Sequence, residues 1–192
     1  MKKSNTLAVL VLAAGTSSRL GKPKQLVLYE GKTLLWHTCS KALKLSRNVF
    51  VVLGAKQKEC KEVIKDFDVN IIFNEEYEEG LSSSIKAGIK NVQSYEKVLV
   101  LLCDQPLMPL SHLEKLIQKS LSENKIISSF YKNNVAVPAI FPKSVYEQLL
   151  CLRGDKGAKA IIKSNSHNYI ILEDELSFDV DTQDDVNKIK DL

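Results

Sequence analysis

The stretch "TLAVLVLAAGTSSRLGKPK", residues 6–24, begins as an apolar run and ends as a loop of small and basic residues. The run at 6–13 has the length and composition of a strand that is buried on both faces of a sheet. The loop that follows leaves the carboxyl end of this strand. Ligands of parallel α/β sheets bind outside the carboxyl ends of the strands, so this loop is the first candidate for a binding site.

Apolar runs of the same kind recur along the first half of the chain, at 48–54, 69–73 and 97–103. Stretches with the spacing of amphipathic helices separate them, at 33–45, 56–66, 82–92 and 111–123. Strands that alternate with helices are joined by right-handed crossovers into a mostly parallel sheet. We therefore predict an α/β fold with a single-domain, Rossmann-like, mostly parallel sheet and helices on both faces.

The second half of the chain is less regular. Segments 126–131 and 134–141 predict a hairpin that turns at Asn133–Asn134, and Pro138 favours an edge position because proline has no N–H to donate. No repeat, linker or shift in composition marks a boundary, so we expect residues 1–192 to form one domain. The remaining predicted elements are helices near 142–151, 157–164 and 182–191 and a strand near 168–172.

The composition excludes several classes of function. A net charge of +4 with dispersed lysines disfavours a nucleic-acid partner. The four cysteines lack CxxC spacing, so a zinc site is not expected, and we interpret them as reduced, buried thiols of a cytoplasmic protein. The N-terminal "MKKSNTLAVLVLAAG" imitates a secretion signal, but its apolar part is short and continues directly into the loop. No window is long enough to span a membrane, and we expect no membrane partner.

The residue types of the loop at 13–24 suit a polyphosphate. Ala13, Ala14 and Gly15 allow a ligand to approach the main chain closely, and free N–H groups there would bind an anion. Arg19 and Lys24 add positive charge, one as a fork and the other as a point charge. The loop matches neither a P-loop nor a dinucleotide-binding turn. An exposed loop with ordinary surface lysines is the alternative.

The segment "LAAGTSSRLGKPK" resembles the signature loop LAAGxSxRMGxPK of nucleotidyltransferases with a Rossmann-like, nucleoside-diphospho-sugar transferase-like fold. It is most similar to the molybdenum cofactor cytidylyltransferase branch. The resemblance implies that the loop wraps a nucleoside triphosphate, with Arg19 and Lys24 on its phosphates as catalytic residues. The nucleotide-binding positions that it implies in the loop are Leu12, Ala13, Ala14, Gly15, Arg19 and Lys24.

Asp104, in "VLVLLCDQPLM", directly follows the fourth predicted strand and so lies on the same sheet edge as the loop. A carboxylate that faces a triphosphate requires a cation between them, and Mg²⁺ bridges phosphate and one or two carboxylates in such sites. An aspartate that forms a turn before Pro106 is the alternative. The "DQP" form is also that of the cytidylyltransferase branch, which favours a catalytic, metal-binding Asp104 with Mg²⁺ as cofactor.

A second source of carboxylates is "FDVDTQDDV", residues 178–186, which resembles the family segment DIDTPEDL. We expect Asp179 and Asp181 to face opposite sides of an extended segment, so that only one reaches the metal, with Asp179 slightly favoured. The other would brace the turn or cap the last helix together with Thr182. A capping cluster without any metal is the alternative.

Two further segments carry family resemblance. "EEGLSSSIKAGIK" predicts a helix capped near Ser82, and the resemblance implies that Ser82 and Ser83 help to frame the nucleoside. Plain helix capping is the alternative. "LRGDKGAKAII" resembles the family's L-x-G-D-x-G-A-R segment, which lies toward the acceptor, although a lysine stands where arginine is usual. The acceptor-binding positions that it implies are Gly154, Asp155, Gly157 and Lys159.

These resemblances imply transfer of CMP from CTP to the phosphate of molybdopterin, with release of pyrophosphate and transient contact with a molybdenum hydroxylase. A methylerythritol-phosphate cytidylyltransferase shares the loop, but its DAARP-like segment is replaced by "CDQP". Guanylyltransferases of the molybdenum pathway usually carry LAGG rather than "LAAG". Another small phosphorylated acceptor, or a non-catalytic partner in maturation of a molybdenum hydroxylase, is also compatible with these residues.

Overall fold

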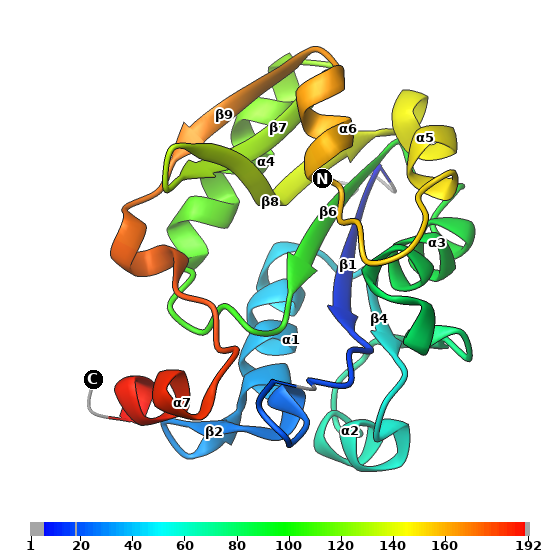
Figure 1. The fold of residues 1–192 in the computed structure, drawn as a ribbon. Coiled ribbons are helices and arrows are strands. Elements are labelled where there is room, and N and C mark those ends of the chain that lie inside the picture. The colour runs from blue at the N-terminus through cyan, green and yellow to red at the C-terminus, as the bar shows by residue number, and fades with distance from the viewer. Residues whose placement is uncertain (1–5, 18, 191–192) are drawn as a thin grey trace.

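The computed structural model describes residues 6–17 and 19–190, and within them the chain forms a seven-stranded sheet with helices on both faces (Figure 1). The strand order is β5-β4-β1-β6-β8-β7-β9, with β8 antiparallel to both of its neighbours. The strands are β1 (Leu7–Ala13), β4 (Val49–Leu53), β5 (Asn70–Phe73), β6 (Lys97–Leu102), β7 (Ile126–Tyr131), β8 (Asn134–Pro142) and β9 (His167–Ile171). This confirms the predicted α/β fold with a mostly parallel sheet.

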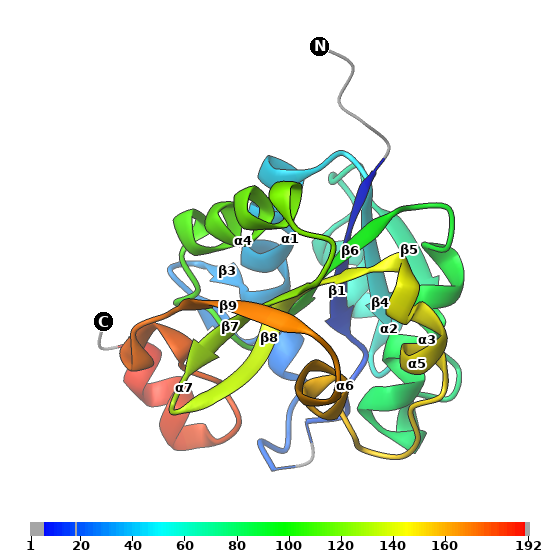
Figure 2. The same ribbon diagram turned by 90° about the horizontal axis from the view of Figure 1, so that it is seen from above.

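Helices cover the sheet on two sides, which Figure 2 shows most clearly for α1 and α4 opposite α5 and α6. One layer consists of α1 (Leu34–Leu45), α2 (Gln57–Val63) and α4 (Leu110–Ser122), and the other of α3 (Leu81–Asn91), α5 (Tyr146–Leu150) and α6 (Lys159–Ser164). The last helix, α7 (Gln183–Lys190), packs beside the loop after β1. Short elements complete the fold: β2 (Leu28–Tyr29), β3 (Lys32–Thr33) and the 3-10 turns Lys24–Leu26, Tyr77–Glu79, Lys143–Val145 and Asp174–Ser177.

Strand β1 is the centre of the core and is buried on both faces, as its continuous apolar sequence predicts. Leu10 and Leu12 face the layer that contains α3, whereas Val9 and Val11 face the layer that contains α1. Each fully buried side chain of this size stabilises the fold by about 1.5–3 kcal/mol relative to an exposed one. The strand is therefore a rigid base for the loop at its carboxyl end.

The hairpin of β7 and β8 differs from the prediction in two ways. Its turn residues are Lys132 and Asn133, both at positive φ, one residue earlier than expected. Strand β8 lies between β6 and β7, so Pro138 is not on an edge. The pairing slips from Ser128–Ala139 to Ser129–Ala136, which leaves Pro138 in a bulge where no ladder N–H is required.

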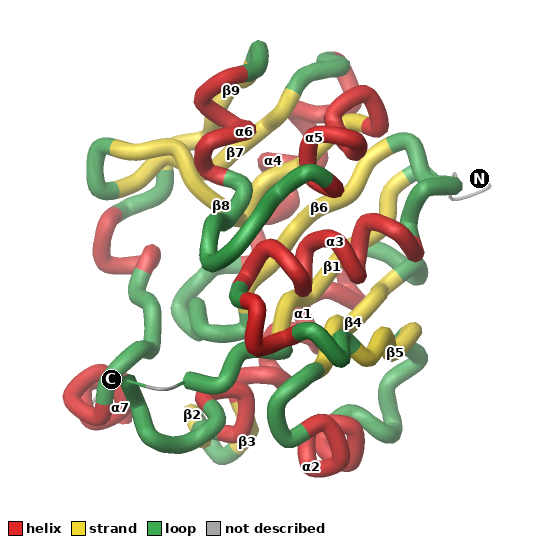
Figure 3. Tube along the Cα trace, turned by 45° about the vertical axis from the view of Figure 1, so that its right-hand side comes forward, coloured by secondary structure: helices red, strands yellow, loops and turns green. Residues whose placement is uncertain are grey.

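A small third cluster ties the C-terminal segment to the loop after β1. Val180, Val186 and Ile189 pack on residues of that loop and of α1, and Val180 is fully buried. The Val180 N–H also donates a hydrogen bond of 2.9 Å to the Asp104 carbonyl oxygen. In Figure 3 the segment before α7 accordingly lies beside the loop that follows β1. Residues from both ends of the chain thus meet at the carboxyl end of β6.

The structure also tests the expectations for the four cysteines and for membrane-spanning helices. Cys39, Cys60 and Cys103 are free and buried, whereas Cys151 is exposed, contrary to expectation. Within residues 6–17 and 19–190, the helices are all too short or too polar to cross a membrane.

Candidate active site

A cavity of about 880 Å³ opens at the carboxyl ends of β1 and β6. One wall consists of Leu12 and Ala13 at the end of β1 and of Ala14, Gly15, Arg19 and Lys24 in the loop that follows. Facing it are the carboxylates of Asp104, Asp179 and Asp181. The structure thus brings together, in one hollow, the basic loop and the acidic residues that the sequence places far apart. The volume lies in the range of ligand sites, which is about 300–1,000 Å³.

Lys24 is the centre of the charge cluster. Its ammonium contacts Asp104 Oδ2 and lies 3.2 Å from Asp181 Oδ1. Burial alone would lower the pKa of Lys24, but the charges of Asp104 and Asp181 outweigh it and raise the pKa well above the ordinary lysine value. Arg19 Nη2 donates to Asp181 Oδ2 at 2.9 Å, although the Arg19 side chain is largely exposed. The cluster therefore keeps a permanently charged ammonium against paired carboxylates.

The expectation that Asp179 and Asp181 face opposite sides is wrong, since both line the cavity. Residues two apart in an extended segment lie on the same side, and the residue between them, Val180, points into the small third cluster. Thr182 caps the last helix as expected, since its hydroxyl accepts from the Asp185 N–H at 3.2 Å, but its partner is Asp185 rather than Asp179 or Asp181. Asp185 Oδ2 accepts from the Thr182 N–H at 2.9 Å and from its hydroxyl at 2.7 Å. Both carboxylates are therefore available to the cavity.

Asp179 has a different environment from Asp181. Gln105 Nε2 donates to Asp179 Oδ1 at 2.9 Å and lies 3.2 Å from the Tyr131 hydroxyl oxygen, and the Tyr131 hydroxyl donates to the Val137 carbonyl at 2.8 Å. Burial raises the pKa of Asp179, and the charge of Asp104 raises it further. Gln105 and Tyr131 were not anticipated as site residues, although Gln105 adjoins Asp104 in "DQP".

Gln25 holds the loop after β1 in shape and was missed by sequence reasoning. Its side chain is buried, and Nε2 donates to the carbonyls of Ala13 at 2.9 Å and Gly15 at 2.8 Å. With these carbonyls turned toward Gln25, the loop is fixed around the cavity by a side chain rather than by regular secondary structure. A lone glutamine in a basic loop gives no sequence signal of burial.

The structure does not bring Ser82 and Ser83 to the cavity. Both are buried, and the Ser83 hydroxyl donates to the Gly80 carbonyl at 2.8 Å and accepts from Asn74 Nδ2 at 2.8 Å. The helix begins at Leu81, with Gly80 rather than Ser82 at the capping position. Leu81 and Ser84, one helical turn apart, line the cavity instead.

The segment at 152–160 lies on the far wall. Asp155 lines the main cavity, whereas Gly157 and Lys159 line an adjoining apolar hollow of about 90 Å³. The Gly154 carbonyl accepts a hydrogen bond from the Ser82 N–H at 3.3 Å. This segment is therefore packed against the start of α3.

The oxygen atoms at the cavity suit a hard divalent cation. Asp104 Oδ1 is buried and has no hydrogen-bond partner, which leaves one acceptor for a positive charge. In the described part of the chain, however, no three His, Cys, Asp or Glu side chains are grouped so that they could hold a metal by themselves. The residues therefore fit a Mg²⁺ or Mn²⁺ ion that takes one or two carboxylate ligands from the protein. Oxygen atoms of phosphate and water would supply the remaining ligands.

A basic loop that faces carboxylates across a cavity, at the carboxyl edge of an α/β sheet, is the arrangement expected of a nucleotidyltransferase. Comparison with known families agrees with this. Residues 9–169 match the MobA-like NTP transferase domain, and the chain belongs to this family.

Individual relatives are similar over nearly the whole chain. The molybdenum cofactor cytidylyltransferase of Escherichia coli is 26% identical over 178 residues, which is 92% of this chain and 91% of that protein. The crystal structure of Rv0371c from Mycobacterium tuberculosis superposes with a TM-score of 0.86 at 25% identity and covers 98% of this chain and 100% of that one. The manganese complex of Rv0371c superposes with a TM-score of 0.83 at 24% identity, over 97% and 98% of the two chains.

Proposed function

We propose that this nucleotidyltransferase transfers CMP from CTP to the phosphate of molybdopterin, with release of pyrophosphate. The observation that carries the proposal is the shared cavity in which Lys24 and the loop after β1 face Asp104 and Asp181. The name of the Escherichia coli relative supports both CTP and this acceptor. The "LAAG" and "CDQP" motifs favour the cytidylyl branch over guanylyltransferases and over methylerythritol-phosphate cytidylyltransferases.

In the proposed reaction an oxygen of the acceptor phosphate attacks the α-phosphorus of CTP. A new P–O bond forms, the bond from the α-phosphorus to the bridging oxygen breaks, and pyrophosphate takes up the electron pair. Lys24 lies deep in the cavity and stabilises charge that develops at the α-phosphoryl group. Arg19, exposed at the rim, is suited to the departing pyrophosphate. The protein's contribution is positioning and charge neutralisation, without a covalent intermediate.

Asp104, with Asp179 or Asp181, would hold Mg²⁺. When bound, the ion neutralises charge between the phosphate oxygens and these carboxylates. The manganese complex of Rv0371c supports a divalent metal in a related protein. The acidic residues themselves would repel a triphosphate, and Lys24 and Arg19 offset only part of their charge.

The acceptor would enter from the wall formed by the segment at 152–160, where Gly157 and Lys159 border the apolar hollow. Lys159 provides a point charge for a phosphate group. The product would pass to a molybdenum hydroxylase during transient contact.

A pyrophosphate-release assay with each of the four nucleoside triphosphates, Mg²⁺ and molybdopterin tests the proposal. CTP-specific, molybdopterin-dependent release is the expected result. GTP-specific release would show that the nucleotide substrate is GTP rather than CTP. CTP-dependent release with another phosphorylated acceptor would show that molybdopterin is not the acceptor. Absence of release with every pair would favour a non-catalytic maturation partner.

A further inference from the structure

The start of α3 is held by a segment far away in sequence. The residue before the helix, Gly80, has no side chain with which to cap it and has a φ of 101°. Instead, Asp155 Oδ1 accepts a hydrogen bond of 3.2 Å from the Leu81 N–H. The Gly154 carbonyl accepts one of 3.3 Å from the Ser82 N–H. Two N–H groups that a helix leaves without intrahelical partners are therefore satisfied by the loop before α6.

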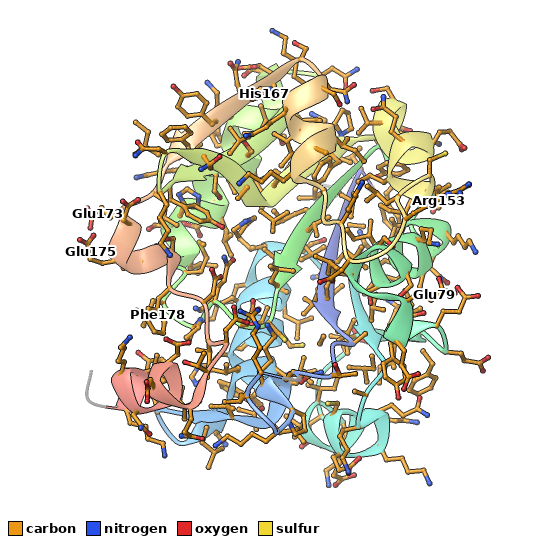
Figure 4. The ribbon with its side chains drawn as sticks, in the orientation of Figure 1. Glu79, Arg153, His167, Glu173, Glu175 and Phe178 are labelled. Carbon is orange, nitrogen blue, oxygen red and sulfur yellow. The ribbon has the colours of Figure 1, made fainter. Side chains whose placement is uncertain are left out.

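Two glycines make this close approach possible. A Cβ added at Gly80 would lie 2.8 Å from the Asp155 Cα, and one at Gly157 would lie 3.1 Å from the Leu81 Cδ2. The two loops thus pack closely, main chain against main chain at Gly80. Figure 4 shows Glu79 and Arg153, which belong to these loops, on the same side of the molecule. The start of α3 and the loop before α6 therefore form a closely packed junction.

Both sides of this junction line the cavity. Leu81 and Ser84 lie on the α3 side, and Asp155 lies on the other. A carboxylate is a poor direct contact for an acceptor that reacts through an anionic phosphate, because like charges repel. The same negative charge is favourable at the N-terminus of a helix. The chemistry and the geometry therefore assign Asp155 to the helix rather than to the acceptor.

We propose that Asp155 is a positioning residue that holds the start of α3 and the loop before α6 together as one wall of the cavity. It acts on the substrates through the placement of Leu81 and Ser84. The inference replaces the acceptor-binding role that family resemblance implies for Asp155, and only its kinetic consequence rests on the proposed function. Its structural consequence can be measured on the substrate-free protein.

The first experiment is amide hydrogen exchange of Leu81 and Ser82, followed by NMR on the full chain. In Asp155→Ala the exchange of the Leu81 amide should accelerate about tenfold or more, because the N–H loses its acceptor. In Asp155→Asn it should stay within about threefold of wild type, since an asparagine oxygen caps a helix as well as an aspartate oxygen. Lys156→Ala, at the adjacent exposed position, is the matched control. Unchanged exchange in Asp155→Ala overturns the proposal.

The second experiment is the CTP-dependent assay with the same variants. Asp155→Ala should raise KM for CTP about fivefold or more, and Asp155→Asn should restore it. If Asp155→Asn is as defective as Asp155→Ala while its amides exchange normally, the carboxylate charge acts directly on substrate and the positioning role is refuted. If the wild-type protein shows no CTP turnover, the proposed function fails, and the exchange data still decide the role of Asp155.

Discussion

The ammonium of Lys24 lies 3.2 Å from Asp181 Oδ1, although the two residues are 157 positions apart in the sequence. The same ammonium contacts Asp104, at the end of β6. A single positive charge thus joins the first loop, the central sheet and the C-terminal segment. Its removal is expected to affect catalysis and metal binding in opposite directions.

Lys24→Ala should lower kcat for cytidylyl transfer by about 100-fold or more, which corresponds to about 3 kcal/mol of transition-state stabilisation. The reason is the loss of the positive charge that, under the proposed function, would lie beside the α-phosphoryl group. Steady-state pyrophosphate release at saturating CTP measures the effect. An unchanged kcat would remove Lys24 from the chemistry.

Lys24→Met should bind Mn²⁺ about tenfold more tightly than the wild-type protein when no nucleotide is present. The ammonium competes with a divalent cation for Asp104 and Asp181, and methionine does not. Isothermal titration calorimetry provides the affinity. Lys22→Met, at an exposed position of the same loop, serves as the control. Equal or weaker Mn²⁺ binding by Lys24→Met would show that the ammonium does not obstruct the metal.

Substitutions at two glycines, Gly15 and Gly54, distinguish a steric effect on the fold from a steric effect on ligand binding. A Cβ at Gly15 would meet nothing within 4 Å, whereas one at Gly54 would lie 2.5 Å from the Tyr77 Cβ and 2.8 Å from the Ala14 carbonyl oxygen. Gly15→Ala should therefore leave Tm within about 2 °C of wild type but raise KM for CTP about tenfold, because under the proposed function the phosphates would approach the main chain there.

Gly54→Ala should instead lower Tm by about 5 °C or more, since the backbone or Tyr77 must move. Thermal unfolding and CTP kinetics of both variants provide the comparison. A normal KM in Gly15→Ala would argue against close approach of the nucleotide to this part of the loop.

Gln25→Glu should destabilise the loop after β1. The carboxylate would face the carbonyls of Ala13 and Gly15, which now receive hydrogen bonds from the amide. Buried acceptors that lose a donor cost about 1–3 kcal/mol each. Urea unfolding should show a loss of about 2 kcal/mol or more, and kcat/KM for CTP should fall as well. Wild-type stability of this variant would mean that the loop has other sufficient supports.

The stability of the fold should depend on the protonation of His112. Its ring lies 2.8 Å from the Ser129 hydroxyl, which itself donates to the Pro138 carbonyl, and burial lowers the pKa of His112 from 6.5 to about 4. The unfolded chain takes up a proton between these values and the folded chain does not. The contribution of neutral His112 to the free energy of unfolding is therefore complete above pH 6.5. It is lost as the pH falls toward 4, by up to about 3 kcal/mol.

Urea unfolding between pH 4.5 and 7.5 tests this dependence. His112→Gln should show a flatter profile across the acidic limb than the wild-type protein, because one titrating group is gone. Identical slopes for the two proteins would exclude His112 as the source.

The strands and most helices were predictable because apolar periodicity reports burial directly. Asp104 was predictable as a site residue because it immediately follows a buried strand. The interior position of Pro138 was not, since a bulge is a property of strand pairing and not of one segment. Ser84 was missed in favour of Ser82 and Ser83 because we expected the helix to be capped by Ser82, whereas Gly80 occupies the capping position two residues earlier.

The hydrogen-bond partners of polar groups at the site were the feature least predictable from the sequence. Gln25 and Tyr131 acquire their roles only when the folded chain places backbone carbonyls beside them. The pairing of Asp155 with the Leu81 N–H joins positions 74 apart, and no local pattern encodes it. Sequence motifs identified the acidic and basic groups, whereas their supporting contacts required the tertiary structure.

The hydrogen bond from Val180 to Asp104 has a consequence for biosynthesis of the protein. Synthesis proceeds from the N-terminus, and the sheet strands up to β9 emerge from the ribosome before residues 178–186. A nascent chain can therefore pair its strands while Asp179 and Asp181 are still missing from the cavity. Under the proposed function, the carboxylates of residues 178–186 would therefore be the last part of the metal site to join the cavity.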